Sequence, residues 1–413
     1  MALINYLIAA IFIVITIRDF KKGLFLTVSW CLLLQILKVT SNVDAFSLVS
    51  IFIISMFVIK LNKRLVGKRY PFIFPTLFCL SSICLTNLLT VPHWPSSLLN
   101  FATSFVMVGV FWYSIQSIED VKKFSRYFFL FLIALIAYGL FEELTKWNPI
   151  MDFIVNNHLN TGSADNPYDY RYGFKRIQSF LGLFGALGVC CVISIIYYVN
   201  LSINYIPVIA KYKKQIPYLI GGLFLCVLFT GTRSIYVCFA VGMTFLLQRK
   251  IIHSKQMFLM IVLAILLIPF VGIYFDSILR SFVDTNSVSG SDVDLRQDQL
   301  DISLYFMSKS PWVGNGFGFT FDTVKYLYIE QIAGAESVWF PLMIDQGLLG
   351  VLSYATVILA SLYYCWAKRN WAGLCICLAF LVGKSMSSIP GMQNTWFLYF
   401  VILTSKLRTF RSY

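Results

Sequence analysis

The stretch SFLGLFGALGVCCVISIIYYV at residues 179–199 carries no charged side chain. A helix rises about 1.5 Å per residue, so a run of this length can cross the roughly 30 Å hydrocarbon core of a bilayer. Comparable apolar runs recur along the chain and predict about 12–13 transmembrane helices. The runs lie near residues 2–17, 24–38, 45–60, 71–91, 98–116, 126–141, 179–199, 217–231, 234–248, 256–274, 338–365, 371–384 and 394–405.

The overall composition agrees with a membrane protein. Hydrophobic residues make up 58% of the 413 residues, charged residues make up 13%, and the mean hydropathy is +0.76. Soluble domains are about 45–50% apolar and about 25% charged, so a cytosolic enzyme, a disordered chain and a fibrous repeat are excluded. The chain shows no internal repeat, low-complexity tract or linker. We therefore predict an all-α, polytopic integral membrane protein in which residues 1–413 form a single domain.

The N-terminal run, which begins MALINYLIAA, has no basic residue in front of it. Arg18, Lys21 and Lys22 follow the run instead, which is the reverse of the order in a cleaved signal peptide. We expect an uncleaved first helix whose N-terminus lies on the outer side of the membrane.

The net charge of +14 has two interpretations, nucleic-acid binding or membrane orientation. Most of the 33 basic residues fall in alternate connecting loops, and these loops hold few of the 19 acidic residues. The positive-inside rule places the basic loops in the cytoplasm, where they also attract anionic lipid, so we expect no nucleic-acid partner. The basic loops lie near residues 18–22, 60–69, 122–126, 211–214, 249–255, 368–369 and 406–411.

Cysteine and histidine give no sign of a metal site. All ten cysteines fall in apolar stretches, which is typical of small buried side chains and indicates neither a disulfide framework nor a zinc ribbon. The three histidines are scattered along the chain. We expect no metal and no cofactor.

Two long connections, at about residues 142–178 and 275–337, interrupt the alternation, and both fall on the outer side. They are rich in aromatic residues and contain helical signals, so we expect them to be functional. In the second loop a helix should begin at Ser291, with Asp294 in the capping-box position, and end near residue 309 before Pro311. One face of this helix would carry Val293, Leu300, Leu304 and Met307, and another would carry Arg296, Gln299 and Ser303.

Three arginines stand out because charges at or near membrane depth are rare and usually functional. Arg233 lies in TGTRS between two apolar runs, Arg176 closes the first outer loop in FKRIQS, and Arg296 lies on the expected helix of the second loop. Guanidinium groups gathered on one side can bind a pyrophosphate bidentately. The alternative for Arg233 is a loop arginine that reaches up to the interface.

Two carboxylates flank the start of the apolar run at 338–365. Glu336, in GAESVWF, lies at the mouth of the run, where partial desolvation suits a general base. Its alternative is a solvated residue that caps the next helix. Asp345 lies deeper, and we favour a helix-packing hydrogen bond or salt bridge for it. The nearby GNGFG at residues 314–318 follows no strand, so we interpret it as a flexible turn.

Four stretches, in this order, resemble motifs of the O-antigen polymerase and ligase superfamily (Wzy and WaaL). They are R-x-x-S at Arg176–Ser179, TGTRS at residues 230–234, Arg296 followed by SPWVGNGFG at residues 310–318, and Glu336-Ser337 followed after nine residues by Gly347-Leu-Leu-Gly350. The resemblance covers about residues 170–350. In the ligases the last motif begins with His, and Glu336 in its place favours a polymerase.

The resemblance implies a GT-C-like glycosyltransferase of the bacterial inner membrane with its active site facing the periplasm. Such a polymerase transfers a glycan from undecaprenyl pyrophosphate to the distal sugar of another lipid-linked repeat unit, with inversion. By this resemblance Glu336 takes the proton of the acceptor hydroxyl, and Arg176, Arg233 and Arg296 hold the pyrophosphate in place of Mg²⁺. Supporting roles fall to Ser179, Thr232, Gln299 and Ser337.

Two other functions remain open. A ligase would transfer the polymer to lipid A–core by similar chemistry, and a flippase or transporter would move lipid-linked oligosaccharides. Transporters usually carry internal repeats and mid-membrane charges, whereas the notable charges here gather on one side. The expected partners are undecaprenyl-pyrophosphate-linked oligosaccharides, membrane lipids and a chain-length regulator protein.

Overall fold

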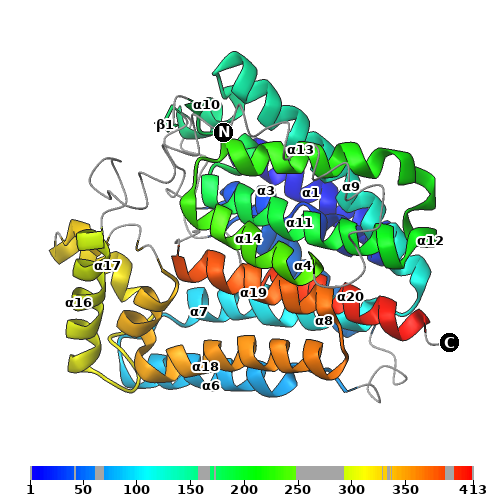
Figure 1. The fold of residues 1–413 in the computed structure, drawn as a ribbon. Helices are drawn as coiled ribbons and strands as arrows, with labels where there is room; N and C mark the ends of the chain where they lie inside the picture. Colours follow the sequence, from blue (N-terminus) through cyan, green and yellow to red (C-terminus); the bar gives the residue numbers. More distant parts are fainter. Residues whose placement is uncertain are drawn as a thin grey trace.

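The computed structural model describes residues 2–40, 43–60, 69–156, 168–171, 174–247, 293–327, 329–332, 335, 337–386 and 395–411. This part of the chain is almost entirely helical, which confirms the all-α prediction (Figure 1). Its one small sheet pairs β1 (Tyr170–Arg171) with β2 (Phe174–Lys175) antiparallel.

The helices follow one another with short connections. Before the sheet they are α1 (Ala2–Arg18), α2 (Phe20–Ser29), α3 (Cys31–Ile36), α4 (Ala45–Ile59), α6 (Ile73–Leu89), α7 (Trp94–Phe101), the π-helical η1 (Ala102–Val106), α8 (Met107–Ser114), α9 (Ile118–Thr145) and α10 (Pro149–Asn156). After it come η2 (Ser179–Leu181), α11 (Phe184–Asn204), α12 (Ile206–Ile209), η3 (Ala210–Gln215), α13 (Ile216–Phe229), α14 (Arg233–Leu247), α16 (Val293–Lys309), α17 (Phe319–Leu327), η6 (Glu330–Ile332), α18 (Trp339–Ala367), α19 (Trp371–Met386) and α20 (Phe397–Arg411).

By length and composition, four helical stretches of the described chain are apolar enough to cross a membrane. They are Trp94–Ser114, Ile118–Thr145, Phe184–Asn204 and Trp339–Ala367. Shorter apolar helices include α4, α6 and α19, which also coincide with predicted runs. The run predicted at residues 256–274 lies outside the described residues.

Some predicted runs differ from the helices that form. The run at 24–38 divides at Trp30, where φ −101° and ψ 10° separate α2 from α3. The Trp30 ring packs edge-on against Phe131 at 5.2 Å between centroids, so a contact with another helix accompanies the bend. The run at 98–116 begins earlier than predicted, at Trp94, because Pro95 is well suited to the first turn of a helix.

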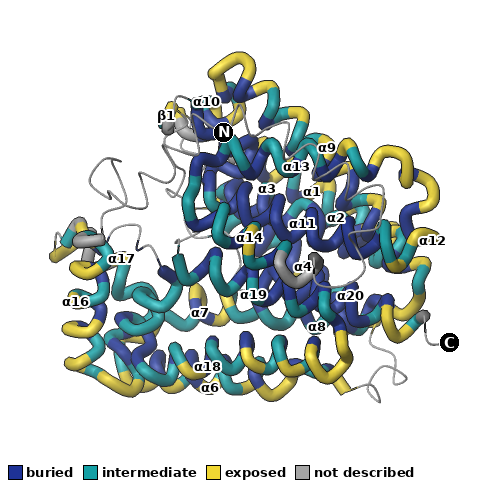
Figure 2. The backbone as a smooth tube through the Cα atoms, in the orientation of Figure 1, coloured by how far each residue is buried: buried dark blue, intermediate teal, exposed yellow. Residues whose placement is uncertain are grey.

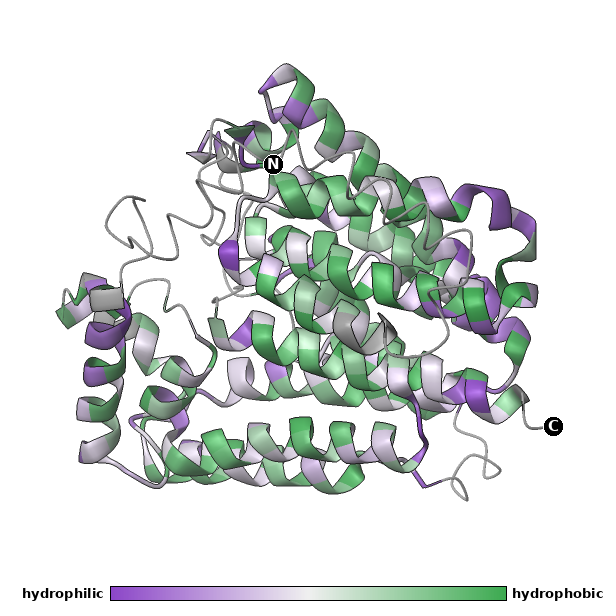
Figure 3. Cartoon of the chain, in the orientation of Figure 1, coloured by the Kyte–Doolittle hydropathy of each residue, from purple (hydrophilic) through white to green (hydrophobic). Residues whose placement is uncertain are grey.

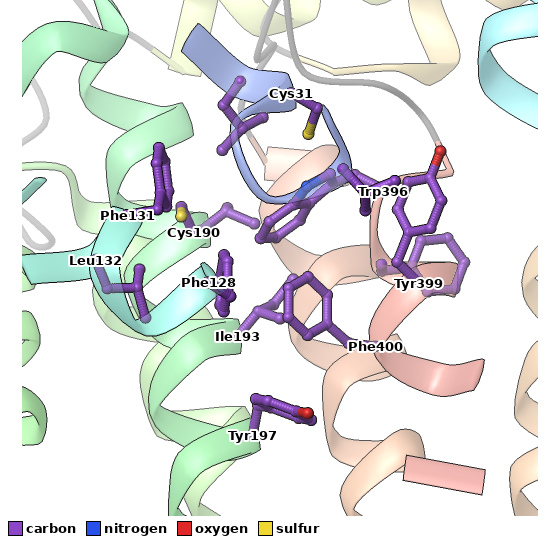
Figure 4. Close-up of a cluster of buried hydrophobic side chains, with 14 of the residues drawn as sticks. Cys31, Phe128, Phe131, Leu132, Cys190, Ile193, Tyr197, Trp396, Tyr399 and Phe400 are labelled. Carbon is purple, nitrogen blue, oxygen red and sulfur yellow. The ribbon is translucent and has the colours of Figure 1, made fainter. Parts of the chain in front are cut away.

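Figure 2 places α11 in the middle of the buried region, and most of its residues are buried. α11 contacts α13, α14, α19 and α20. Figure 4 shows the aromatic and sulfur side chains that fill this centre, among them Phe128 from α9 and Phe400 from α20, whose rings are 5.0 Å apart. Tyr197 of α11 also lies within 2.7 Å of the Ser125 hydroxyl, which satisfies a buried polar group.

Polar residues gather at the two ends of the long helices and apolar residues lie between them (Figure 3). The described parts of both predicted outer loops, α10 with β1 and α16 with α17, lie at one end of the molecule. α12 and the C-terminus lie at the opposite end (Figure 1). The fold therefore brings the two loops to the same end, which we call the loop end.

Candidate active site

Arg176 of the R-x-x-S motif is fixed by contacts on every side. Its Nε donates to the carbonyl oxygen of Thr230 at 2.9 Å, and its Nη2 donates to Oγ1 of Thr232 at 2.9 Å. Nη1 forms an ion pair with Asp169 Oδ2 at 2.6 Å. The guanidinium carbon lies 3.9 Å from the centroid of the Phe184 ring, a cation–π contact. The first two motifs of the resemblance therefore lie together in the structure.

The TGTRS turn joins α13 to α14. Gly231 has φ +60°, a conformation that glycine adopts with little strain. α14 then begins at the half-buried Arg233, so the Arg233 side chain lies at the positive end of a helix dipole. Both features favour an anion. Thr232, which we predicted as a supporting residue, accepts a hydrogen bond from Arg176.

Arg296 lies on α16 at the end of a neighbouring helix. Its Nη2 donates to the carbonyl oxygen of Met386, the last residue of α19, at 3.3 Å. α19 packs along α14, where Cys238 Sγ donates to the carbonyl oxygen of Ala379 at 2.9 Å. Arg296 thus contacts α19, the helix beside the one that Arg233 begins.

The buried face of α16 differs from the prediction. Gln299 and Ser303 are buried, whereas Leu304 of the predicted apolar face is 43% exposed. Gln299 Nε2 donates to the carbonyl oxygen of Gln331 at 2.9 Å, and Ser303 Oγ donates to the carbonyl oxygen of Gln299 at 2.6 Å. Gln299 finds a partner outside the helix on this side, whereas the Ser303 hydroxyl is satisfied within α16 itself. Gln299 therefore has a structural contact rather than a free side chain.

The predicted base, Glu336, lies outside the described residues. The residues that follow it are docked on the end of α19. Ser337 is buried, the N–H of Val338 donates to the carbonyl oxygen of Lys384 at 3.0 Å, and Trp339 Nε1 donates to Ser385 Oγ at 2.8 Å. The last turn of α19 therefore contacts both Val338–Trp339 and Arg296.

Lys384 is a residue of this region that we did not predict. Its side chain is only 4% exposed, although it stands in an apolar run. The signal was present in the sequence, since a lone basic residue inside a membrane run is a candidate for function by the same rule that identified Arg233.

The P-x-x-G-x-G and G-x-x-G motifs form a backbone lock, defined here as residues 310–318 bound to the break in α18. The N–H groups of Leu348 and Leu349 donate to the carbonyl oxygens of Pro311 and Trp312 at 2.8 and 3.0 Å. In return, Asn315 and Gly316 donate to the carbonyl oxygens of Ile344 and Asp345. The prediction of a flexible turn at residues 314–318 is wrong, because these bonds fix it.

Gly347 makes the lock possible. Its φ +59° and ψ −152° interrupt α18, and a Cβ there would meet Gly314 N at 2.6 Å and Pro311 O at 2.8 Å. The Asp345 carboxylate adds side-chain bonds, because it accepts from the N–H groups of Gly318 at 3.0 Å and Thr320 at 2.7 Å. This confirms the helix-packing role favoured for Asp345.

Ser179, at the end of the R-x-x-S motif, is fully buried. Its Oγ donates to the carbonyl oxygen of Leu135 at 3.0 Å, and its φ is +51°. Ser179 therefore supports the local turn and does not face a substrate.

The aromatic residues of the first outer loop share one carboxylate. Trp147 Nε1 and the Tyr168 hydroxyl donate to Asp152 Oδ2 at 2.8 and 2.6 Å. The hydrogen bond to Asp152 raises the pKa of Tyr168 to about 12, so its hydroxyl is a neutral donor at pH 7. Both rings are exposed, and Tyr168 immediately precedes Asp169, the partner of Arg176.

Residues 218–355 match the family model Wzy_C, described as O-antigen ligase. The matched region runs from α13 into α18 and includes Arg233, Arg296, Glu336 and the backbone lock. Arg176 lies before it and joins it through Thr230 and Thr232. No curated protein matches the chain.

The matched residues, the apolar helices and the order of the motifs agree with one another. The match at residues 218–355 and the apolar helices are consistent with a membrane protein of the O-antigen polymerase and ligase superfamily, whose members are glycosyltransferase-like enzymes.

Proposed function

We propose that the chain is an O-antigen polymerase of the bacterial inner membrane. It transfers a glycan from undecaprenyl pyrophosphate to the distal sugar of another lipid-linked repeat unit on the periplasmic face. The observation that carries this proposal is the contact of Arg176 with Thr230 and Thr232, which places a fixed guanidinium beside Arg233 at the start of α14. Cations gathered at one membrane face suit a pyrophosphate leaving group.

The reaction is a direct displacement at the anomeric carbon. The acceptor hydroxyl oxygen bonds to this carbon as the carbon–oxygen bond to the pyrophosphate breaks, and the configuration inverts. Glu336 takes the hydroxyl proton. Arg176, Arg233 and Arg296 neutralise the charge that develops on the departing pyrophosphate, a role that Mg²⁺ fills in many phosphate sites. The polyprenyl chains stay in the lipid and the sugars remain at the loop end.

Arg176 is engaged with Asp169 before any substrate binds. A pyrophosphate carries more negative charge than one carboxylate, so it competes with Asp169 for Nη1 of Arg176. The bonds to Thr230 and Thr232 can persist during this exchange, because they use Nε and Nη2 rather than Nη1.

Ligase activity is the second candidate, because the matching family model is described as O-antigen ligase. Glu336 in place of the motif His favours the polymerase. The two enzymes share the donor and differ in the acceptor, which is a lipid-linked repeat unit for one and lipid A–core for the other. A chain-length regulator is the expected protein partner of the polymerase.

Deletion of the gene, followed by gel analysis of surface polysaccharide, separates the candidates. Loss of a polymerase leaves single repeat units on the core. Loss of a ligase leaves bare core and accumulated lipid-linked polymer, and loss of a flippase traps single units inside the cell. Either of the last two results contradicts the polymerase proposal.

A further inference from the structure

A fully buried ion pair lies directly beside the R-x-x-S motif. Lys175 Nζ is 3.1 Å from Glu142 Oε1, and both side chains are 0% exposed. Glu142 belongs to the last turns of α9, and Lys175 ends β2, one residue before Arg176. Burying two charges carries a large desolvation cost that their attraction often fails to recover. Stability alone is therefore a weak reason for this pair.

The second oxygen of Glu142 binds the backbone of the motif. Oε2 accepts from the N–H of Ser179 at 2.8 Å and from the N–H of Gln178 at 3.2 Å. Ser179 has φ +51°, a conformation that costs free energy for any residue with a Cβ. On the other side of the turn, Asn148 Nδ2 donates to the carbonyl oxygen of Ser179 at 3.0 Å. The surrounding groups thus hold an unfavourable turn in place.

Arg176 lies between the two anchored points. Lys175 before it is bound to Glu142 Oε1, and the N–H groups two and three residues after it are bound to Glu142 Oε2. Between them, the N–H of Ile177 donates to the carbonyl oxygen of Phe229 at 3.0 Å, which sets the segment against the end of α13. One carboxylate therefore controls the path of the backbone that carries the Arg176 side chain to the TGTRS turn.

We propose that Glu142, paired with Lys175, is the positioning residue for Arg176, and so determines how tightly the site binds a polyprenyl pyrophosphate. Glu142 is fully buried and does not touch the substrate. A planar guanidinium binds phosphate oxygens only when its fork is correctly aimed, and a misplacement of about 1 Å can cost about 100-fold in rate. The inference rests on the proposed function for the identity of the ligand.

Two matched double variants separate positioning from charge burial. Glu142→Gln with Lys175→Met removes both charges but keeps a side-chain oxygen for the N–H groups of Gln178 and Ser179. Glu142→Leu with Lys175→Met removes the charges and that oxygen. The probe is undecaprenyl pyrophosphate without sugar, bound to detergent-purified protein, with melting temperature measured on the same samples.

The Gln variant should bind the probe within about threefold of wild type, and the Leu variant should bind at least about tenfold more weakly. For transfer of glycan, the Leu variant should raise KM for the lipid-linked donor more than it lowers kcat. Equal affinities of the two variants, whether both normal or both weak, overturn the inference.

If the Leu variant does not fold, the single substitution Glu142→Asp in the otherwise wild-type protein tests the inference. It keeps the charge facing Lys175 but draws the carboxylate back by one methylene, so the inference predicts a folded protein with at least about fivefold weaker binding of the probe. Normal binding by Glu142→Asp overturns the inference. Failure of the proposed function looks different, since wild-type protein would then bind the probe without forming polymer.

Discussion

The two outer loops hold their motifs by different means. In the first loop, charged side chains hold the motif: Asp169 binds Arg176, and Glu142 binds the turn that follows Arg176. In the second loop, the backbone lock joins residues 310–318 to α18 through paired N–H and carbonyl groups. Charged contacts can exchange partners when a substrate arrives, whereas a backbone lock cannot without unfolding locally. Under the proposed function, the first loop is therefore suited to binding the leaving group, and the second to holding a fixed frame.

The largest effect should come from breaking the lock. Gly347→Ala places a Cβ within 3 Å of backbone atoms of Gly314 and Pro311. The alanine would also have to adopt a positive φ, which is unfavourable for a residue with a Cβ. Because backbone atoms cannot move aside as a side chain can, we expect a loss of at least about 3 kcal/mol and little folded protein. The measurement is the yield of monodisperse protein in detergent.

The control for this variant is Gly221→Ala in α13, where an added Cβ meets nothing within 4 Å. Alanine is the better helix former, so this protein should be made at the wild-type level. A normal yield of Gly347→Ala would mean that the break in α18 does not depend on glycine.

Next in size is the loss of the proposed base. Glu336→Gln keeps the shape of the side chain but removes its ability to take a proton, so chain growth should stop while the protein level stays normal. The length of surface polysaccharide on a gel, together with an immunoblot, measures both. Asp298→Asn, an exposed carboxylate on α16, is the control and should give normal polymer. Near-normal polymer from Glu336→Gln would remove Glu336 from the mechanism.

Arg233→Lys tests whether charged side chains bind the pyrophosphate leaving group. Lysine keeps the positive charge but lacks the planar fork, so we expect transfer to slow about 100-fold with normal protein levels. The rate of polymer formation by purified protein measures the effect. Arg408→Lys, at the opposite end of the molecule, makes the same chemical change on an exposed residue of α20 and should leave the rate unchanged. A fast Arg233→Lys protein would contradict a bidentate contact with pyrophosphate.

The sequence predicts the local features of both loops better than their partners. The uncharged run at 179–199 and the capping signal near Ser291 identify helices because the information is contained in neighbouring residues. The break at Gly347 cannot be predicted from the sequence, since the hydrogen-bond partners of the residues around it lie 29 to 37 residues earlier and G-L-L-G is compatible with a straight helix. For the same reason the sequence gives no hint that Glu142 pairs with Lys175.

The buried face of α16 shows a second limit of what the sequence can predict. Periodicity favours burial of Leu300 and Leu304, but a hydrogen-bond partner on another segment can favour burial of the polar face of a helix instead. Gln299 is buried because Gln331, in a separate segment, offers a carbonyl oxygen. Among the site residues, charge placement identified Arg176, whose contacts with Thr230 and Thr232 the structure then supplied.

The smallest effect should come from Asp345→Asn, which weakens the side-chain part of the lock and leaves its backbone part intact. Asparagine can still accept from Thr320, but its amide group would face the N–H of Gly318, so one donor is left without an acceptor. We expect a loss of about 1–3 kcal/mol and a lower melting temperature, with the transfer rate below the melting range near normal. Asp301→Asn, on the exposed side of α16, should leave the melting temperature unchanged. If Asp345→Asn instead abolished transfer in a fully stable protein, the second loop would take part in the chemistry and the contrast between the loops would fail.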